Sequence, residues 1–345
     1  MAAFYDARGN TYFVASPEEI GGFADIAPSA AAAAAARERW APRAIERICG
    51  RGNLSAPAAG GAAKRYRSDG LLVGPFPDGR AFGLLIVNTD GTLAERSGNG
   101  LTIFSQWLVD TARADRSGAF LLRVHHAVPG ASQAQAPFIE ARIEAAEREG
   151  HEGFWIDMGV PAFGPAAVGA APEHFGASQF RGCPVARVFD LEKIEASWNC
   201  SQFVSVGNPH CVTFLESPER LPSMQQLGSE PWLARLSAIA NSTDSDGVRG
   251  TGRPCRNGIN LQWAAAAGPD CVDARVFERG EGPTLSSGSS ATAVASAARS
   301  LGLIDAKTVD VRMPGGVAPV RFDERNGRLE RVMLFGEARR ANPPI

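Results

Sequence analysis

One arrangement of residues occurs twice in this sequence, and it constrains the fold more than any other feature. Each time, an apolar run typical of a strand ends in a polar, glycine-containing turn, and a helical pattern follows. The first copy is NTDGTLAERSGNG at residues 88–100, and the second is ERGEGPTLSSGSS at residues 278–290. A Ser-Gly pair begins nine residues after the polar residue that ends each strand, at Ser97 and at Ser287. We expect the helices at residues 101–114 and 291–301.

Such turns are suited to binding an anion. The first backbone N–H groups of a helix have no partner inside the helix and lie at the positive end of its dipole. Glycine and serine there let a carboxylate or phosphate approach the backbone closely. Two such helix starts that grip one carboxylate would place Ser97 and Ser287 on opposite faces of the adjacent carbon. That arrangement predicts racemisation or epimerisation without a cofactor. The alternative interpretation of each serine is a helix N-cap, for which serine is among the preferred residues.

The length and the pattern of elements predict a duplicated fold. Single hydrophobic cores seldom grow beyond about 250–300 residues, so 345 residues suit two domains. Strand-like segments outnumber helical ones, and each half has one long helix after its Ser-Gly turn. We expect an α+β fold of two pseudo-symmetric halves, each a mixed sheet or barrel around a central helix, with the site in the cleft between them. The expected domains are residues 1–151 and 152–333, with 334–345 returning to the first domain.

Composition and local motifs argue against several classes of binding partner and cofactor. The net charge of −2 and the lack of a basic tail argue against nucleic acid. No stretch approaches the roughly 18–20 apolar residues of a membrane helix, and the N-terminus lacks a signal-peptide pattern, so we expect a cytoplasmic protein. The six cysteines form no Cys-x-x-Cys pair, and the five histidines lack metal-ligand spacing. No Rossmann fingerprint, P-loop or plausible pyridoxal lysine is found, so neither a metal nor a cofactor is expected.

Together, the motifs resemble those of the diaminopimelate epimerase family. Its members are cofactor-independent amino-acid racemases and epimerases. The matching segments cover nearly the whole chain and lie at residues 9–14, 69–72, 88–100, 156–161, 206–210, 258–260 and 277–284. The resemblance implies the two-halved fold described above and an isomerase that acts at the α-carbon of diaminopimelate or a related amino acid. It also implies a role in lysine biosynthesis, a small amino-acid substrate and no cofactor, and it leaves room for a homodimer.

The resemblance also assigns roles to individual residues. Ser97 and Ser287 stand at the positions of the family's two catalytic cysteines. The residues expected to hold the distal end of the substrate are Asn88, Asn208, Asn260 and Arg279. The reacting amino group would be received by Glu278 and the backbone of Arg279. The reacting carboxylate would be held by the backbone N–H groups of Gly98, Asn99, Gly288 and Ser289, and Asn10 would line the same pocket.

Serine at both catalytic positions is a departure from the family. A thiol has a reference pKa of about 8.5, which a cleft can lower, whereas a serine hydroxyl needs a neighbouring base to become reactive. Two further positions differ: Ser289-Ser290 replaces the family's Thr-Gly, and Thr102 replaces its Arg. Three hypotheses follow. The first is an isomerase, the second is a lyase that removes a proton from one side of a hydroxy-amino acid, and the third is a catalytically silent amino-acid-binding homologue.

Overall fold

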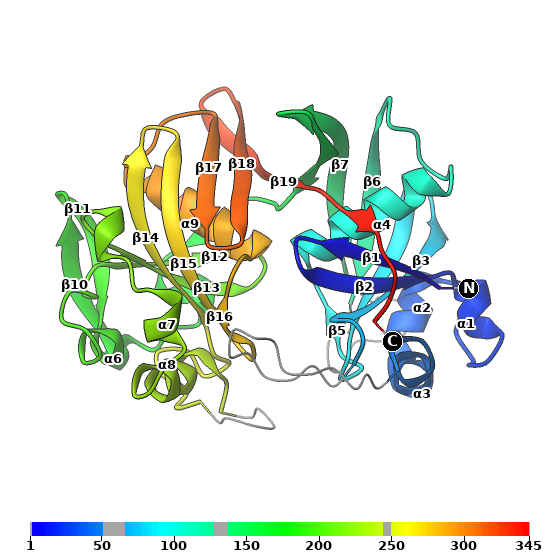
Figure 1. Cartoon of the computed structure of the whole chain (residues 1–345), viewed down its shortest axis with the longest axis horizontal. Coiled ribbons are helices and arrows are strands. Elements are labelled where there is room, and N and C mark those ends of the chain that lie inside the picture. Colours follow the sequence, from blue (N-terminus) through cyan, green and yellow to red (C-terminus); the bar gives the residue numbers. More distant parts are fainter. Residues whose placement is uncertain (1, 51–65, 127–136, 244–249, 345) are drawn as a thin grey trace. The chain divides into compact units, whose positions relative to one another are not determined.

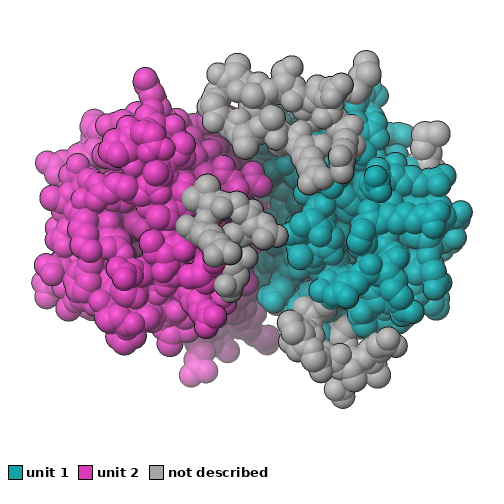
Figure 2. Space-filling model, turned by 90° about the horizontal axis from the view of Figure 1, so that it is seen from below, with its two compact units in different colours: residues 1–57, 62–157, 335–345 teal, residues 58–61, 158–334 magenta. Residues whose placement is uncertain are grey.

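The computed structural model describes residues 2–50, 66–126, 137–243 and 250–344. The chain divides into two compact units (Figure 2). Unit 1 holds the described residues up to Asp157 together with Phe335 to Pro344, and unit 2 runs from Met158 to Leu334. The boundary at Asp157 lies beyond the expected one at residue 151. The reason is that β8 (His151–Asp157) pairs antiparallel with β7 (Phe138–Arg148) and stays in unit 1.

Unit 1 is a mixed sheet with helices on both faces (Figure 1). Its remaining strands are β1 (Ala3–Ala7), β2 (Asn10–Ala15), β3 (Gly70–Asp78), β4 (Ala81–Asn88), β5 (Leu93–Ala94), β6 (Ala119–His125) and β20 (Arg339–Arg340). Its helices are α1 (Pro17–Gly21), α2 (Ala30–Ala35), α3 (Arg37–Ala44), the π-helical turn η1 (Ile45–Cys49) and α4 (Gly98–Asp110). Strand β20, in the C-terminal segment, pairs antiparallel with β1.

Unit 2 is built in the same way. Its strands are β9 (Ala162–Phe163), β10 (Phe175–Phe180), β11 (Cys183–Val188), β12 (Ser201–Ser205), β13 (Pro209–Phe214), β14 (Asn260–Gly268), β15 (Cys271–Glu278), β16 (Gly282–Thr284), β17 (Thr308–Met313), β18 (Gly316–Arg325) and β19 (Arg328–Gly336). Its helices are α5 (Pro165–Val168), the short 3-10 turns η3 (Pro172–His174) and η4 (Pro218–Arg220), α6 (Phe189–Glu192), α7 (Met224–Leu227), α8 (Trp232–Ala240) and α9 (Gly288–Ser300).

The two units share one order of strand pairing. In unit 1, β1–β2 and β3–β4 are antiparallel while β2–β3 and β4–β6 are parallel. In unit 2, β12–β13 and β14–β15 are antiparallel while β13–β14 and β15–β17 are parallel. The second parallel crossover of each unit contains its long helix, α4 or α9. The predicted α+β fold with two similar halves is therefore confirmed.

The helix α9 is buried on every side, which explains its composition. It packs against β12, β13, β14, β15, β17 and β18 (Figure 1). Alanines 291, 293, 295, 297 and 298 have no exposed surface, and small residues are what allow strands to approach one helix all round. On the outer face of each sheet lies a second core, around Trp40 in unit 1 and around Trp198 and Trp263 in unit 2. Each sheet is therefore covered on both faces.

Each long helix begins three residues earlier than the sequence pattern indicated. α4 begins at Gly98 and not at residue 101, and α9 begins at Gly288 and not at residue 291. The expected starts are those of the helical pattern itself, at Leu101 and Ala291. In the structure, Ser97 and Ser287 cap the helices, so these glycines lie in the first turn, where they cost less. Among the described residues, no helix has the length and apolar character needed to cross a membrane.

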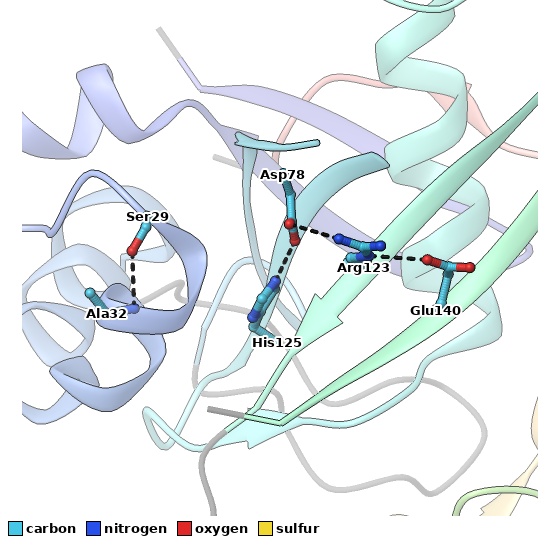
Figure 3. Close-up of polar contacts among 6 residues, drawn as sticks. All are labelled: Ser29, Ala32, Asp78, Arg123, His125 and Glu140. Atoms are coloured by element: carbon cyan, nitrogen blue, oxygen red, sulfur yellow. Dashed lines mark hydrogen bonds and ion pairs between the residues drawn. The ribbon is translucent and has the colours of Figure 1, made fainter. Parts of the chain in front are cut away.

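A polar cluster joins β3, β6 and β7 in unit 1 (Figure 3). Asp78 accepts a hydrogen bond from Arg123 at 3.0 Å and lies 2.7 Å from Nε2 of His125, while Arg123 also donates to Glu140 at 3.0 Å. Burial acts to raise the pKa of Asp78, but the bonds from His125 and Arg123 outweigh it and hold that pKa below its ordinary value. The cluster ties β6 to its partner β7 and also to β3, which is joined to β6 only through β4, and it is best explained as a stabilising contact.

We predict that Asp78→Ala lowers the free energy of unfolding at pH 7 by about 1–2 kcal/mol, because one carboxylate serves two partners. A lowered folded-state pKa stabilises the fold above the unfolded-state pKa of about 3.9, and that contribution is lost as the pH falls through the folded-state pKa. Urea unfolding between pH 7 and pH 2 should therefore show the difference shrink with acidity. The exposed Asp25→Ala is the control, and an equal loss in both variants would contradict the prediction.

Candidate functional site

Ser97 caps helix α4 and leaves two backbone donors open. Its Oγ accepts a hydrogen bond from the N–H of Gly100 at 3.0 Å, and its carbonyl accepts from Leu101 at 2.8 Å. The N–H groups of Gly98 and Asn99 make no hydrogen bond to another described residue. These two are the groups that the resemblance assigned to a carboxylate, and they lie at the positive end of a 13-residue helix.

The other predicted residues of unit 1 lie in two places. Asn10, at the start of β2, accepts a hydrogen bond from Nδ2 of Asn99, so it borders the start of α4. Asn88 ends β4, and its Nδ2 donates to Oγ1 of Thr92 at 2.9 Å. The backbone N–H of Asn88 also donates to the carbonyl of Thr92 at 2.9 Å. The side chain of Asn88 is therefore used within its own turn, which is the simpler of the two interpretations of an asparagine at a strand end.

The turns contain a feature that the sequence pattern did not show. After each polar turn the chain forms a short strand that pairs antiparallel with the strand it has left: β5 with β4, and β16 with β15. Each short strand ends three residues before its serine, at Ala94 for Ser97 and at Thr284 for Ser287. Because each serine lies nine residues after the end of the preceding long strand, the two serines occupy equivalent positions in their units.

Ser287 differs from Ser97 in having a carboxylate partner. Its Oγ accepts from the N–H of Ser290 at 3.3 Å, as a cap does, and donates to Oε1 of Glu278 at 2.7 Å. Ser287 is 7% exposed. The N–H groups of Gly288 and Ser289 make no hydrogen bond to another described residue, as at α4. The start of α9 therefore combines two unbonded backbone N–H groups, which suit an anion, with a hydroxyl–carboxylate pair.

The environment of Glu278 changes its acidity. Burial raises the pKa of its carboxyl group, and the nearby Glu281 raises it further, while the hydrogen bond from Ser287 acts in the opposite direction. The result is a pKa above the ordinary value of a glutamate. A carboxylate with a raised pKa is a better proton acceptor, which is the property that a general base needs.

In unit 2, neighbouring residues fix the side chains that are predicted to hold the distal end of the substrate. Oδ1 of Asn260 accepts the backbone N–H of Arg279 at 2.9 Å, and the guanidinium of Arg279 donates to the carbonyl of Asn257 at 2.8 Å. Gly258 has a φ of +74°, and a Cβ there would lie 2.3 Å from the carbonyl oxygen of Ala240 and 2.9 Å from Cδ of Arg279. Only glycine fits this position, so steric exclusion of a side chain explains why the Gly-Ile-Asn segment begins with glycine.

Asn208 belongs to a buried chain of hydrogen bonds. Its Oδ1 lies 2.8 Å from Nε2 of His210, and Nδ1 of His210 lies 2.9 Å from Nε2 of Gln262. The same Gln262 nitrogen reaches Oγ of Ser290 at 3.1 Å, in the first turn of α9. In the other direction, Nδ2 of Asn208 points to Oγ of Ser289 at 3.4 Å. Asn208 is thus joined to the start of α9 twice, through its Nδ2 to Ser289 and through His210 and Gln262 to Ser290.

Within each unit, the structure therefore brings together most of the residues that were predicted to form the site. At the start of α4 lie Ser97, Gly98, Asn99 and Asn10, whereas Asn88 lies within its turn. Around the start of α9 lie Ser287, Gly288, Ser289, Glu278 and Asn208, with Asn260 fixed to the backbone of Arg279. In the described part of the chain, no group of three or more His, Cys, Asp or Glu side chains is arranged to hold a metal ion.

Two contributing residues were not predicted from sequence. Gln262 follows Asn260 by two positions in β14 and so faces the same side of the sheet. A glutamine inside an otherwise apolar strand was the signal that could have identified it. Asn241 accepts the N–H of Gly280 at 2.8 Å and thereby holds the turn after Glu278. It follows α8 in the chain, far from every motif, so no local pattern indicated its role.

We predict that Ser97→Ala and Ser287→Ala each lower the free energy of unfolding by about 1 kcal/mol, because each removes a helix N-cap. Ser97→Gly and Ser287→Gly should lose only a few tenths of a kcal/mol, because glycine is itself among the favoured N-cap residues. Chemical denaturation of the four variants measures this. Equal losses for alanine and glycine would show that the serines do not act as caps.

Comparison with known proteins agrees with this geometry. The family model for diaminopimelate epimerase matches residues 202–341. Diaminopimelate epimerase 2 of Nostoc sp. is 29% identical over 318 residues, which cover 90% of this chain and 85% of that protein. The diaminopimelate epimerase of Xanthomonas axonopodis pv. citri is 30% identical over 268 residues, covering 76% of each. A solved phenazine biosynthesis protein of the PhzF family from Bacillus anthracis matches with a TM-score of 0.58 at 10% identity, covering 99% of this chain and 96% of that one.

The fold is thus the one seen in diaminopimelate epimerase-like and PhzF-like proteins, with two similar α+β halves. The sequence relationship is more specific than the fold. The chain belongs to the diaminopimelate epimerase family, a family of isomerases, and the resemblance drawn from the motifs is confirmed. The roles of the individual site residues remain predictions.

Proposed function

We propose that this protein is a cofactor-independent isomerase that acts at the α-carbon of diaminopimelate or a closely related amino acid. The observation that carries the proposal is the Ser287–Glu278 pair, with Oγ and Oε1 2.7 Å apart at the start of a helix. A serine hydroxyl alone is too weak an acid to form a base at neutral pH. A neighbouring carboxylate with a raised pKa can accept the proton that the hydroxyl gives up.

The chemical step follows from these groups. Oγ of Ser287 accepts the α-proton of the substrate as it passes its own proton to Glu278, so no free alkoxide has to form. The electron pair of the broken C–H bond moves into the substrate's carboxylate. The open N–H groups of Gly288 and Ser289 and the dipole of α9 stabilise the added charge. Return of a proton to the other face completes the inversion, and the resemblance assigns that face to Ser97. Its hydroxyl would pass a proton from solvent to the carbon as it gives up its own, and Glu278 would return its proton to solvent.

The distal residues support an amino-acid substrate with a second polar end. Oδ1 of Asn208 and Oδ1 of Asn260 are both occupied, by His210 and by the backbone of Arg279. Each carboxamide therefore presents its NH2 group as a donor, although one N–H of Asn208 also reaches Oγ of Ser289 at 3.4 Å. Two amide donors and the guanidinium of Arg279 suit a carboxylate, and diaminopimelate carries one at each end.

We predict that purified protein in deuterated water exchanges the α-proton of diaminopimelate, and that Glu278→Gln lowers the exchange rate at least roughly hundredfold, because the proton acceptor is lost. Mass spectrometry of the recovered substrate measures the exchange. Glu281→Gln is the matched control, since it removes the same charge from the same turn and leaves Glu278 in place. Binding of diaminopimelate without exchange or elimination would instead favour a silent binding protein.

The pH profile provides a separate prediction. Exchange requires Glu278 without its proton, so the rate should rise with pH and level off above the pKa of Glu278. Because burial and Glu281 raise that pKa, the inflection should lie above the ordinary glutamate value of about 4.3. In Glu281→Gln the inflection should move to lower pH, since one source of repulsion is gone. A profile identical in both proteins would contradict the assignment of Glu278 as the base.

The difference between the two serines favours a lyase as the second candidate. Oγ of Ser287 donates to a carboxylate, whereas the only described hydrogen bond of Ser97 Oγ is with the N–H of Gly100. One competent base is enough to remove a proton and eliminate water from a 3-hydroxylated amino acid. Exchange from only one configuration of the α-carbon, together with release of a keto acid, would support the lyase. Exchange from both configurations would exclude it, and Ser97→Cys should add exchange from the second configuration if only a thiol is missing.

A further inference from the structure

We infer that His210 is a positioning residue, whose buried imidazole, held by Gln262, fixes the carboxamide of Asn208 with its NH2 group directed to the start of α9. The inference uses the proposed function only in taking Asn208 as a substrate contact. The hydrogen-bond chain itself is a property of unit 2.

Burial makes the chain rigid. His210, Gln262 and Ser290 have no exposed surface, so water does not compete for their hydrogen bonds. His210 and Asn260 are direct partners in the parallel pair β13–β14, and Gln262 lies two positions further along β14. The sheet register thus brings Gln262 beside His210. Oε1 of Gln262 makes no hydrogen bond to a described residue, so the glutamine acts on the chain through its NH2 group.

The chemistry of each group determines the direction of the chain. The NH2 group of Gln262 can only donate, so Nδ1 of His210 accepts with its lone pair. A neutral imidazole that accepts at Nδ1 carries its proton on Nε2, and Nε2 therefore donates to Oδ1 of Asn208. With its oxygen occupied, Asn208 directs Nδ2 to Oγ of Ser289, and the open backbone N–H of that same residue is a candidate carboxylate donor.

The charge state of His210 agrees with this role. Burial, together with the positive charge of Arg279, lowers the pKa of His210 to about 3, while the hydrogen bond with Gln262 acts in the opposite direction. With the NH2 group of Gln262 at Nδ1, a protonated ring would place an N–H against a donor. His210 therefore stays neutral at physiological pH.

The direct test does not require activity. Nitrogen-15 NMR of protein labelled in its histidine rings distinguishes the two neutral tautomers and the cation, and His210→Gln identifies the signal. At pH 7 we expect the tautomer with the proton on Nε2. A proton on Nδ1, or a cationic ring, would overturn the inference. Because the wild-type protein is measured, the result stands even if a variant fails to fold.

A second measurement tests the effect on the substrate. Gln262→Glu replaces the donor to Nδ1 with an acceptor, which should reverse the chain and turn the oxygen of Asn208 toward the ligand. We expect KM for diaminopimelate to rise roughly tenfold or more while kcat changes much less, because a binding contact is lost and the base is untouched. The control is Gln202→Glu, the same change at a glutamine that is hydrogen-bonded to Ser300 and lies outside this chain of hydrogen bonds. It should leave both KM and kcat unchanged.

The two measurements distinguish a failure of this inference from a failure of the proposed function. An unchanged KM in a folded Gln262→Glu variant would overturn the positioning role. If the wild-type protein neither binds nor converts diaminopimelate, the proposed function fails, and the tautomer of His210 still decides whether the chain runs as inferred.

Discussion

The position at which each long helix begins is the constraint on which the rest of the site depends. Ser97 and Ser287 accept a backbone N–H from within the first turn, at Gly100 and Ser290. The cap satisfies the third N–H of each helix and leaves the first two free, so two donors at the positive end of the dipole point away from the helix. Burial of α9 among six strands then fixes where those donors lie. Moving a cap by one residue would change which groups are open.

The two helix starts are alike in form and differ in chemistry. Both follow a strand, a polar turn and a short returning strand, and Thr102 and Thr292 even make the same hydrogen bond, 2.8 Å to the carbonyl four residues earlier. The difference is that Glu278 stands where the first copy has Asn88. A carboxylate can take a proton from serine, whereas Asn88 donates to Thr92 within its own turn. One difference at the end of a strand thus gives the Ser287 hydroxyl a carboxylate partner, whereas the described hydrogen bond of the Ser97 hydroxyl is the one from Gly100.

Much of the architecture could be predicted from local pattern. Apolar runs before Asn88 and Glu278 identified β4 and β15, and the Ser-Gly pairs identified the helices that follow. The predicted starts of those helices were three residues too late, because the first turn of each consists of glycine, serine and asparagine and carries no apolar pattern. The short strands β5 and β16 were missed since two or three residues carry too little pattern, and only pairing with a neighbour makes them strands. The compact units divide at Asp157 and not at the expected residue 151, because β8 pairs with β7 and stays in unit 1.

The sequence by itself determined the family, the duplication and the residue types at each helix start, because those depend on motifs whose members are close together in the chain. Only the tertiary structure decided how the side chains are used. Ser287 meets Glu278 because β16 turns the chain back along β15, and His210 meets Gln262 because β13 and β14 pair in one register. The state of an ionisable group depends on what surrounds it in space. For that reason the raised pKa of Glu278 and the neutral imidazole of His210 could not be read from the order of residues.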